Sequence, residues 1–305
     1  MKIKATLFLA ALCAVSLNSY AQRGEWTGSN TVWSYDMTKK TAGQDSVGGD
    51  NLSLVSTGAT EAFLPSPSSG SAIVTSTKGS PSFIHQSGSN ASVKVRAANE
   101  DGSPAKFSLF GIKEATPVAA ISFTITPNHQ AKKSDWYIVL GKEALFFKDG
   151  KTTLPINKTG SSPNAAVFAS FRLQSSEGFG EKAAEKYRFQ TREQAELEDD
   201  ITWANSNTNL FTRGKKHEVE IYANNTMGEQ SYTLNGTTYK VPKRSYHLWI
   251  DGKKIGADFQ ANAVRRNQPL DSFLIMSRDA VSGSVGSKNA STIEVRDVKI
   301  KYAAR

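Results

Sequence analysis

The chain has 305 residues, a formal net charge of +9 and one cysteine, Cys13. A single thiol excludes an intramolecular disulfide and a metal site built from several thiolates. The excess of Lys and Arg favours an acidic partner, and the alternative is that the charge only keeps the surface solvated.

The first 21 residues have the pattern of a secretory signal peptide. Lys2 and Lys4 form a positive start, apolar residues follow as far as Leu17, and Ser19-Tyr-Ala21 resembles a cleavage site. The apolar stretch is too short to span a bilayer, and no later segment has the required length. Cleavage would leave 284 residues without cysteine and with a net charge of +7. We therefore expect a secreted or periplasmic protein with no membrane span.

From about Trp26 onward, short strand patterns alternate with polar turns rich in glycine. Asp149-Gly150, Asn235-Gly236 and Asp251-Gly252 tolerate positive φ angles and predict hairpin turns. The clearest predicted strands are Ile121–Thr126, Trp136–Leu140, Ala166–Leu173, Glu218–Tyr222, Tyr246–Ile250, Phe273–Ser277 and Ile293–Tyr302. The chain has no repeat of fixed period and no strand–helix–strand pattern, so we predict an all-β protein, a β-sandwich of two antiparallel sheets.

Residues 22–305 are predicted to form one domain. Segments 43–80 and 86–105 are rich in Gly, Ser and Pro, but strand-like pieces interrupt them, which is typical of loops rather than a linker. The segments that start at Trp33 and at Val295 alternate in the same way. Pairing of this first strand with the last would close the domain on itself.

Two short segments carry the main functional signal. In Ala169–Gln174 and Tyr187–Arg192, polar and apolar residues alternate with period two. Neighbouring strands of this kind would place Arg172, Gln174, Arg188, Gln190 and Arg192 on one sheet face. Guanidinium and amide groups bind carboxylate or sulfate groups, so the face suits an acidic polymer. The second segment lies within Glu181–Asp200, where helix-forming residues are frequent, and a short surface helix is the alternative there.

Most of the mature chain resembles the concanavalin-like or laminin-G-like jelly roll. The resemblance rests on His217–Asn225, on Tyr246–Gly252 with its Asp-Gly end, on Asp271-Ser-Phe-Leu-Ile-Met, and on Glu294-Val-Arg-Asp-Val-Lys-Ile. Phe63-Leu-Pro-Ser-Pro-Ser-Ser-Gly70 is similar to segments of secreted polysaccharide-utilisation proteins with this fold. The resemblance implies two antiparallel sheets with a polymer lying across one of them. It does not separate enzymes from binding modules.

Among enzymes of this fold, hydrolases and lyases need different residues. A hydrolase needs carboxylates at alternating positions of one strand, and Glu218-Val-Glu220 lacks the third acidic residue of that pattern. A lyase needs a group that neutralises the uronate carboxylate and a base that removes the C5 proton. Among lyases, the small jelly-roll ulvan lyases look most similar, because ulvan offers both uronate and sulfate.

The candidate site residues follow from these roles. Arg172 is the predicted neutralising group, and the candidate bases are His247, Tyr137 and, if its strand has the opposite parity, Tyr246. Predicted substrate-binding residues are Gln174, Arg188, Gln190 and Trp249, the last as a stacking platform. For a single histidine or tryptophan in a strand, a structural role is the alternative.

No cofactor is expected to be required. The four histidines lack the spacing of a transition-metal site, while Asp36 and Asp297 near the paired termini are candidates for a structural calcium ion. The chain has none of the nucleotide-binding or RNA-binding motifs, so we expect no nucleic-acid partner. The expected state is a monomer that binds an acidic polysaccharide.

The sequence thus predicts an exported lyase that cleaves a uronate-containing, ulvan-like polysaccharide by β-elimination. Two alternatives stay open. One is a non-catalytic carbohydrate-binding or adhesion protein of the same fold, and the other is an envelope or matrix protein without sugar specificity.

Overall fold

The computed structural model describes residues 24–41, 43–58, 60–100, 102–128, 134–151, 166–174, 186–194, 201–279 and 291–304. The predicted signal peptide and Cys13 lie outside the described residues. Within strands, only the backbone is described at 134, 193, 194, 201, 202, 205, 206, 208, 209 and 279.

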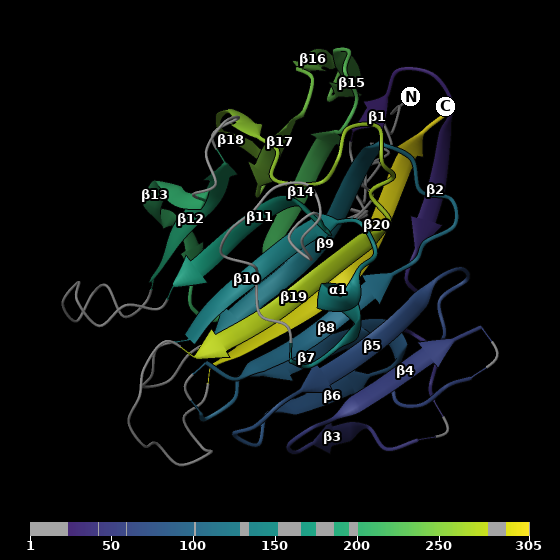
Figure 1. Cartoon of the computed structure of the whole chain (residues 1–305), viewed down its shortest axis with the longest axis vertical. Helices are drawn as coiled ribbons and strands as arrows, with labels where there is room; N and C mark the ends of the chain where they lie inside the picture. Colours follow the sequence, from purple (N-terminus) through teal and green to yellow (C-terminus); the bar gives the residue numbers. More distant parts are fainter. Residues whose placement is uncertain are drawn as a thin grey trace, which may run out of the picture.

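The described chain forms two large antiparallel sheets that stack face to face, which confirms the predicted jelly-roll β-sandwich (Figure 1). The eight-stranded sheet has the order β13 (Ile201–Thr212), β12 (Lys186–Gln194), β11 (Val167–Gln174), β10 (Ser134–Gly141), β19 (Ser272–Asp279), β8 (Pro104–Phe110), β5 (Ser71–Ser76) and β4 (Ser53–Thr57).

The nine-stranded sheet has the order β18 (Lys253–Gln260), β17 (Ser245–Ile250), β14 (His217–Asn224), β9 (Val118–Asn128), β20 (Thr292–Ala303), β7 (Ser92–Arg96), β6 (Ser82–Gln86) and β3 (Ser46–Gly48), and β2 (Asn30–Ser34) also pairs with β20. A small third sheet consists of β1 (Glu25–Trp26), β15 (Gln230–Leu234) and β16 (Thr237–Val241). Short helical segments are α1 (Leu145–Lys148) and a 3₁₀ turn at Gly88–Asn90.

The core lies between the two large sheets because each strand buries alternate residues. Trp136 and Phe171 of the eight-stranded sheet and Ile121 and Leu248 of the nine-stranded sheet belong to one apolar cluster. Side chains of opposite parity point to the outer face of each sheet. The sandwich therefore has two outer faces on which polar groups can gather.

All seven strands predicted above are present, with small differences at their ends. The predicted hairpin turns at Asn235-Gly236 and Asp251-Gly252 join β15 to β16 and β17 to β18, and all four residues have positive φ. The expectation for Asp149-Gly150 was wrong: this dipeptide follows helix α1, and the Asp149 amide donates to the Leu145 carbonyl (3.1 Å).

Two further pairings predicted from the sequence are present. The early strand β2 pairs antiparallel with β20, with Trp33 opposite Ile300. The segment with two possible structures, which includes Tyr187–Arg192, is strand β12 and pairs with β11. Its surface-helix alternative is excluded because Phe189 faces the core between the sheets, where the alternating pattern places it.

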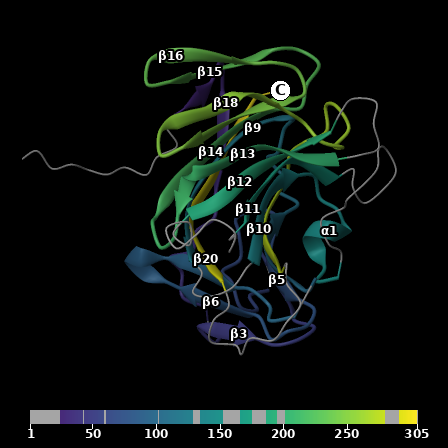
Figure 2. The same cartoon turned by 90° about the vertical axis from the view of Figure 1, so that its left-hand side faces the viewer.

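The outer faces carry different elements. Helix α1 lies on one side of the sandwich, away from the β15–β16 hairpin at its end (Figure 2). The hairpin packs on the outer face of the nine-stranded sheet through a cluster that includes Tyr222, Tyr232 and Trp249. Helix α1 packs on the outer face of the eight-stranded sheet through Phe146 and Phe147.

Candidate functional site

The outer face of the eight-stranded sheet gathers most of the polar residues predicted to bind an acidic polymer. The register places Arg172 between Gln190 on β12 and Tyr137 on β10, and Gln174 between Arg188 and Asp135. We call this set of side chains the arginine face: Asp135, Tyr137, Arg172, Gln174, Arg188, Gln190, Arg192, Trp203 and Arg278.

Arg172 is held in one orientation at the centre of this face. Its Nε and Nη2 both donate to Gln190 Oε1, at 3.0 and 2.7 Å. Its guanidinium lies 4.4 Å from the ring centroid of Trp203, a cation–π contact, and Nη1 is 3.6 Å from Asp135 Oδ2. The Arg172 side chain is 17% exposed, so it is partly open to solvent while its orientation is already set.

Asp135 lies beneath Arg172 and was missed by the sequence analysis. Its Oδ2 accepts hydrogen bonds from Gln174 Nε2 (3.0 Å) and from the Tyr137 hydroxyl (3.3 Å). Burial raises the pKa of this carboxyl above its usual range, although Gln174, Arg172 and Tyr137 act in the opposite direction. Its parity was the available signal, because Asp135 and Tyr137 are two residues apart on one strand and must share a face.

Tyr137 is the candidate base that the structure places beside Arg172. Burial raises the pKa of its phenol to about 12, the negative charge of Asp135 adds to this shift, and Arg172 opposes it. The phenol therefore keeps its proton at neutral pH. In this state Tyr137 is suited to donating a proton, and removing one from a substrate requires a further positive charge or a change in its surroundings.

The edge of the arginine face is also basic. Arg192 on β12 is buried, and burial lowers the pKa of its guanidinium to about 10, although Tyr137 opposes the shift. Arg188 and Arg278 are half-buried on β12 and β19. These side chains place cations on β19, next to β10, and on β12, which is separated from β10 by β11.

Helix α1 covers the other half of the same sheet. Lys106 on β8 is fully buried, and its Nζ donates to the Phe146 carbonyl (3.1 Å) and lies 3.5 Å from Asp149 Oδ1. Burial lowers the pKa of this lysine to about 8, although Asp149 acts to raise it. Lys106 thus anchors the helix, and the arginine face lies on the other side of the sheet, formed by β19 and β10 to β13.

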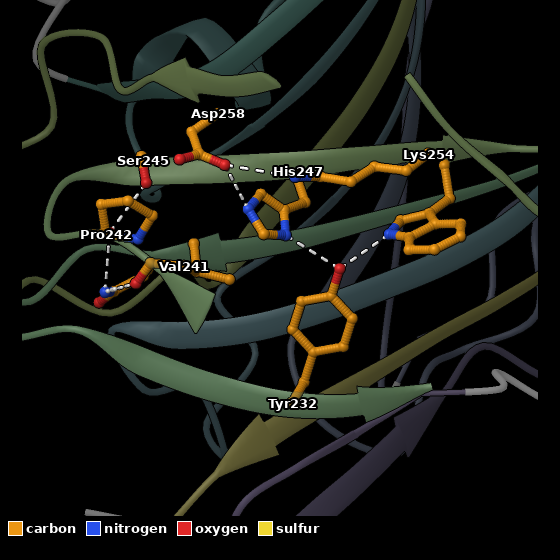
Figure 3. Close-up of polar contacts among 9 residues, drawn as sticks. Tyr232, Val241, Pro242, Ser245, His247, Lys254 and Asp258 are labelled. Carbon is orange, nitrogen blue, oxygen red and sulfur yellow. Dashed lines mark hydrogen bonds and ion pairs between the residues drawn. The ribbon is translucent and has the colours of Figure 1, made fainter. Parts of the chain in front are cut away.

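His247 and Trp249 lie on the opposite side of the sandwich, on the outer face of the nine-stranded sheet. Figure 3 shows the His247 ring between Asp258 and Tyr232. His247 Nε2 is 2.6 Å from Asp258 Oδ1, and its Nδ1 is 2.9 Å from the Tyr232 hydroxyl. Trp249 Nε1 donates to the same hydroxyl (2.8 Å). We call this set, Tyr232, His247, Trp249 and Asp258, the hairpin network because Tyr232 belongs to the β15–β16 hairpin.

The predicted site residues are thus divided among three places. Tyr137, Arg172, Gln174, Arg188 and Gln190 share the arginine face, whereas His247 and Trp249 belong to the hairpin network. Tyr246 lies in the core, fully buried with its ring 5.3 Å from that of Phe259, so it faces neither outer surface. The structure does not bring the candidate bases His247 and Tyr246 to Arg172, and their catalytic roles stay sequence predictions.

The two calcium candidates lie near the pairing of β2 with β20. The Asp36 carboxylate accepts from the Thr38 amide (3.0 Å) and hydroxyl (2.6 Å), and Asp297 has a positive φ where the β20–β9 register shifts. No group of three or more His, Cys, Asp or Glu side chains suited to a metal occurs among the described residues. Two carboxylates do not supply the six to eight oxygen ligands of calcium, so the ion stays a prediction that needs further oxygen donors.

In the part of the chain that the structure describes, no helix has the length and apolar character needed to cross a membrane. No family model and no curated protein matches this sequence. Solved structures match at low similarity. An alginate lyase from Chlorella virus matches with 13% identity and a TM-score of 0.38, over 72% of this chain and 88% of that one.

LamA from Z. galactanivorans, solved with laminaritriose and laminaritetraose, matches with 13% identity and a TM-score of 0.40, over 70% of this chain and 79% of that one. A sialidase matches with 11% identity and a TM-score of 0.36, over 69% of this chain. This chain spans only 15% of the sialidase's length.

Proposed function

We propose that the protein is a lyase that cleaves a uronate-containing, acidic polysaccharide at the arginine face. The observation that carries the proposal is the orientation of Arg172, which Gln190 and Trp203 hold while the side chain stays partly exposed. A guanidinium in this state binds a carboxylate without first losing side-chain freedom. The adjacent phenol of Tyr137 supplies the group that exchanges protons.

The proposed reaction is a β-elimination. Arg172 and Gln174 would bind the uronate carboxylate and stabilise the negative charge that develops when the C5 proton leaves. The C5–H electron pair forms the C4–C5 double bond, the bond from C4 to the glycosidic oxygen breaks, and that oxygen takes up a proton. Tyr137 is the residue of this face that would remove the first proton and supply the second, with the charge of Arg172 lowering the cost of its ionised form.

A non-catalytic carbohydrate-binding protein is the second candidate, and the pKa of Tyr137 favours it. Burial and Asp135 raise that pKa to about 12, which opposes loss of the phenolic proton. The Arg and Gln side chains would still bind carboxylate or sulfate groups in that case. The two candidates share the binding surface and differ only in whether Tyr137 transfers protons.

The arginine face also suits ulvan, whose sulfate groups would bind the rim arginines Arg188 and Arg278. Planar guanidinium groups bind sulfate and carboxylate with similar geometry. We expect this protein to act outside the cytoplasm, as its predicted signal peptide indicates.

The test is an assay for unsaturated uronate, by its ultraviolet absorbance, on ulvan, alginate, pectate and hyaluronate, together with affinity gels that contain the same polymers. We expect an absorbance rise on at least one polymer, and Arg172→Ala should reduce turnover by at least about 100-fold. The matched control is Arg266→Ala, because Arg266 is an exposed arginine in the loop between β18 and β19.

Each outcome separates the candidates. Binding to a polymer without any absorbance rise would leave the non-catalytic function. Full activity of Arg172→Ala, with correct folding by circular dichroism, would move the active site away from the arginine face.

A further inference from the structure

The polar groups of the arginine face converge on a carboxylate that the chain itself supplies. Asp135 Oδ2 accepts from Gln174 Nε2 (3.0 Å) and from the Tyr137 hydroxyl (3.3 Å), and it lies 3.6 Å from Arg172 Nη1. Arg172, Gln174 and Tyr137 are the groups expected to meet a uronate carboxylate. The carboxylate of Asp135 therefore interacts with the same groups that would bind the carboxylate of a ligand.

Because Asp135 is buried beside Arg172, its negative charge would act on a ligand carboxylate bound there. The Asp135 side chain is 9% exposed, whereas Arg172 and Gln174 are half-buried and reach the surface above it. A ligand carboxylate bound to Arg172 would then lie within a few ångströms of Asp135. Two like charges at about 4 Å in a partly buried site repel by roughly 4 kcal/mol, so one of them takes up a proton instead.

We propose that Asp135 couples ligand binding to proton uptake: it keeps Arg172, Gln174 and Tyr137 in place as a carboxylate, and it becomes protonated when an anionic sugar binds. The inference rests on the function proposed above and adds a regulatory residue to that site. Protons and charge balance, because the Asp135 carboxylate takes up one proton from solvent when one anionic group binds. As a carboxylic acid, Asp135 can donate its proton to the ligand and no longer competes for Arg172.

The groups around Asp135 are consistent with this direction. Arg172 and Gln174 face it from β11, Arg278 from β19 and Tyr137 from its own strand, while Arg188 lies opposite Gln174. The cations lower the pKa of Asp135, and burial is the larger effect and raises it. A bound anion would cancel part of the cationic effect and raise the pKa of Asp135 further. The affinity for the anion therefore falls as the pH rises above the pKa that Asp135 has in the unliganded protein.

The test is isothermal titration calorimetry with oligosaccharides of whichever uronate polymer binds in the gel assay, in two buffers that differ in ionisation enthalpy. For the unmodified protein we expect uptake of up to about one proton per site, and an affinity that falls as the pH rises, by up to about tenfold per pH unit. This measurement needs no variant.

Asp135→Asn removes the charge and keeps the shape of the side chain. We expect it to bind about tenfold more tightly at neutral pH and to lose the proton uptake linked to binding. The matched control is Asp45→Asn, an exposed aspartate before β3, which should behave as the unmodified protein does.

The outcomes distinguish this inference from the proposed function. Binding without proton uptake, or Asp135→Asn binding no more tightly than the unmodified protein, would overturn the inference and leave the proposed function standing. If no uronate polymer binds to the unmodified protein or to Asp135→Asn, both fall.

Discussion

The arginine face and the hairpin network both place a buried carboxylate or imidazole among aromatic and polar side chains, but they distribute their hydrogen bonds differently. In the hairpin network the hydrogen bonds run in a line from Trp249 to Tyr232 to His247 to Asp258. In the arginine face, Arg172, Gln174 and Tyr137 all meet one carboxylate, that of Asp135.

This difference indicates which region binds a ligand. His247 is 1% exposed and both of its ring nitrogens have partners, so its imidazole is not available to an incoming sugar. Arg172 is partly exposed and its donors outnumber the acceptors that Asp135 and Gln190 offer. We therefore interpret the hairpin network as a group of contacts that stabilises the fold, and the arginine face as the region that binds a ligand.

The largest expected effect of a single substitution is that of Tyr137→Phe, which tests whether the arginine face is the functional region. The change removes the proton-transferring hydroxyl and keeps the ring, so we expect turnover of the uronate polymer to fall by about 10²- to 10⁴-fold. Binding in affinity gels should change by less than about tenfold, because Arg172 and Gln174 remain. Comparable loss of binding and turnover would mean that the hydroxyl of Tyr137 acts in binding and not in proton transfer.

The next largest effect is expected in the hairpin network. Tyr232→Phe leaves the Trp249 N–H and His247 Nδ1 buried without their common partner, and we expect it to lower the free energy of unfolding by about 1–3 kcal/mol. Urea denaturation measures this change, and turnover should stay unaltered. The control Tyr239→Phe removes a hydroxyl from the next strand of the same hairpin, and its effect on stability should be smaller.

A smaller effect is expected for Trp203→Ala. The Trp203 ring lies against Arg172, and loss of this cation–π contact should weaken polymer binding by about 1 kcal/mol, or fivefold. Trp203→Phe should restore most of the affinity, because it keeps an aromatic surface. Calorimetric titration of the three proteins would distinguish this role from general packing, since a packing role would change stability and leave affinity unaltered.

The smallest effect concerns pH. Burial, with a contribution from Lys254, lowers the pKa of His247 below its usual value, while Asp258 opposes the shift. The unfolded chain therefore binds a proton more readily, so this histidine lowers stability as the pH falls below about 6.5. Thermal unfolding at about pH 7.5 and about pH 5.5 measures the effect. His247→Asn should make the dependence on pH less steep, and an unchanged slope would contradict the assignment.

The alternating patterns predicted the faces of single strands well. Arg172 and Gln174 share one face, and His247 shares another with Trp249, because a strand allows only two orientations. The patterns also predicted which face of each strand lies in the core, because apolar side chains such as Leu248 and Phe171 are stabilised by burial. The strand of Tyr187–Arg192 was also recoverable, despite helix-forming neighbours.

The relation between strands was not predictable from these patterns. Arg172 and His247 belong to different sheets, and nothing local to either segment says so, because sheet membership depends on long-range pairing. Asp135 was overlooked for a related reason: a carboxylate on a face selected for anion binding looks unfavourable until its three donors are known. Helix α1 was missed because four residues carry too weak a helical pattern.

The position of β20 has a consequence for how this chain reaches its native state. Among the described strands it is the last to be synthesised, yet it lies between β9 and β7, inside the nine-stranded sheet, and also pairs with β2. Until Thr292–Ala303 is available, the sheet consists of two separate halves with exposed edges. Folding thus depends on contacts between distant parts of the sequence and is expected to be slow. The export that the predicted signal peptide implies would benefit from this delay, because a chain crosses a membrane more readily before it folds.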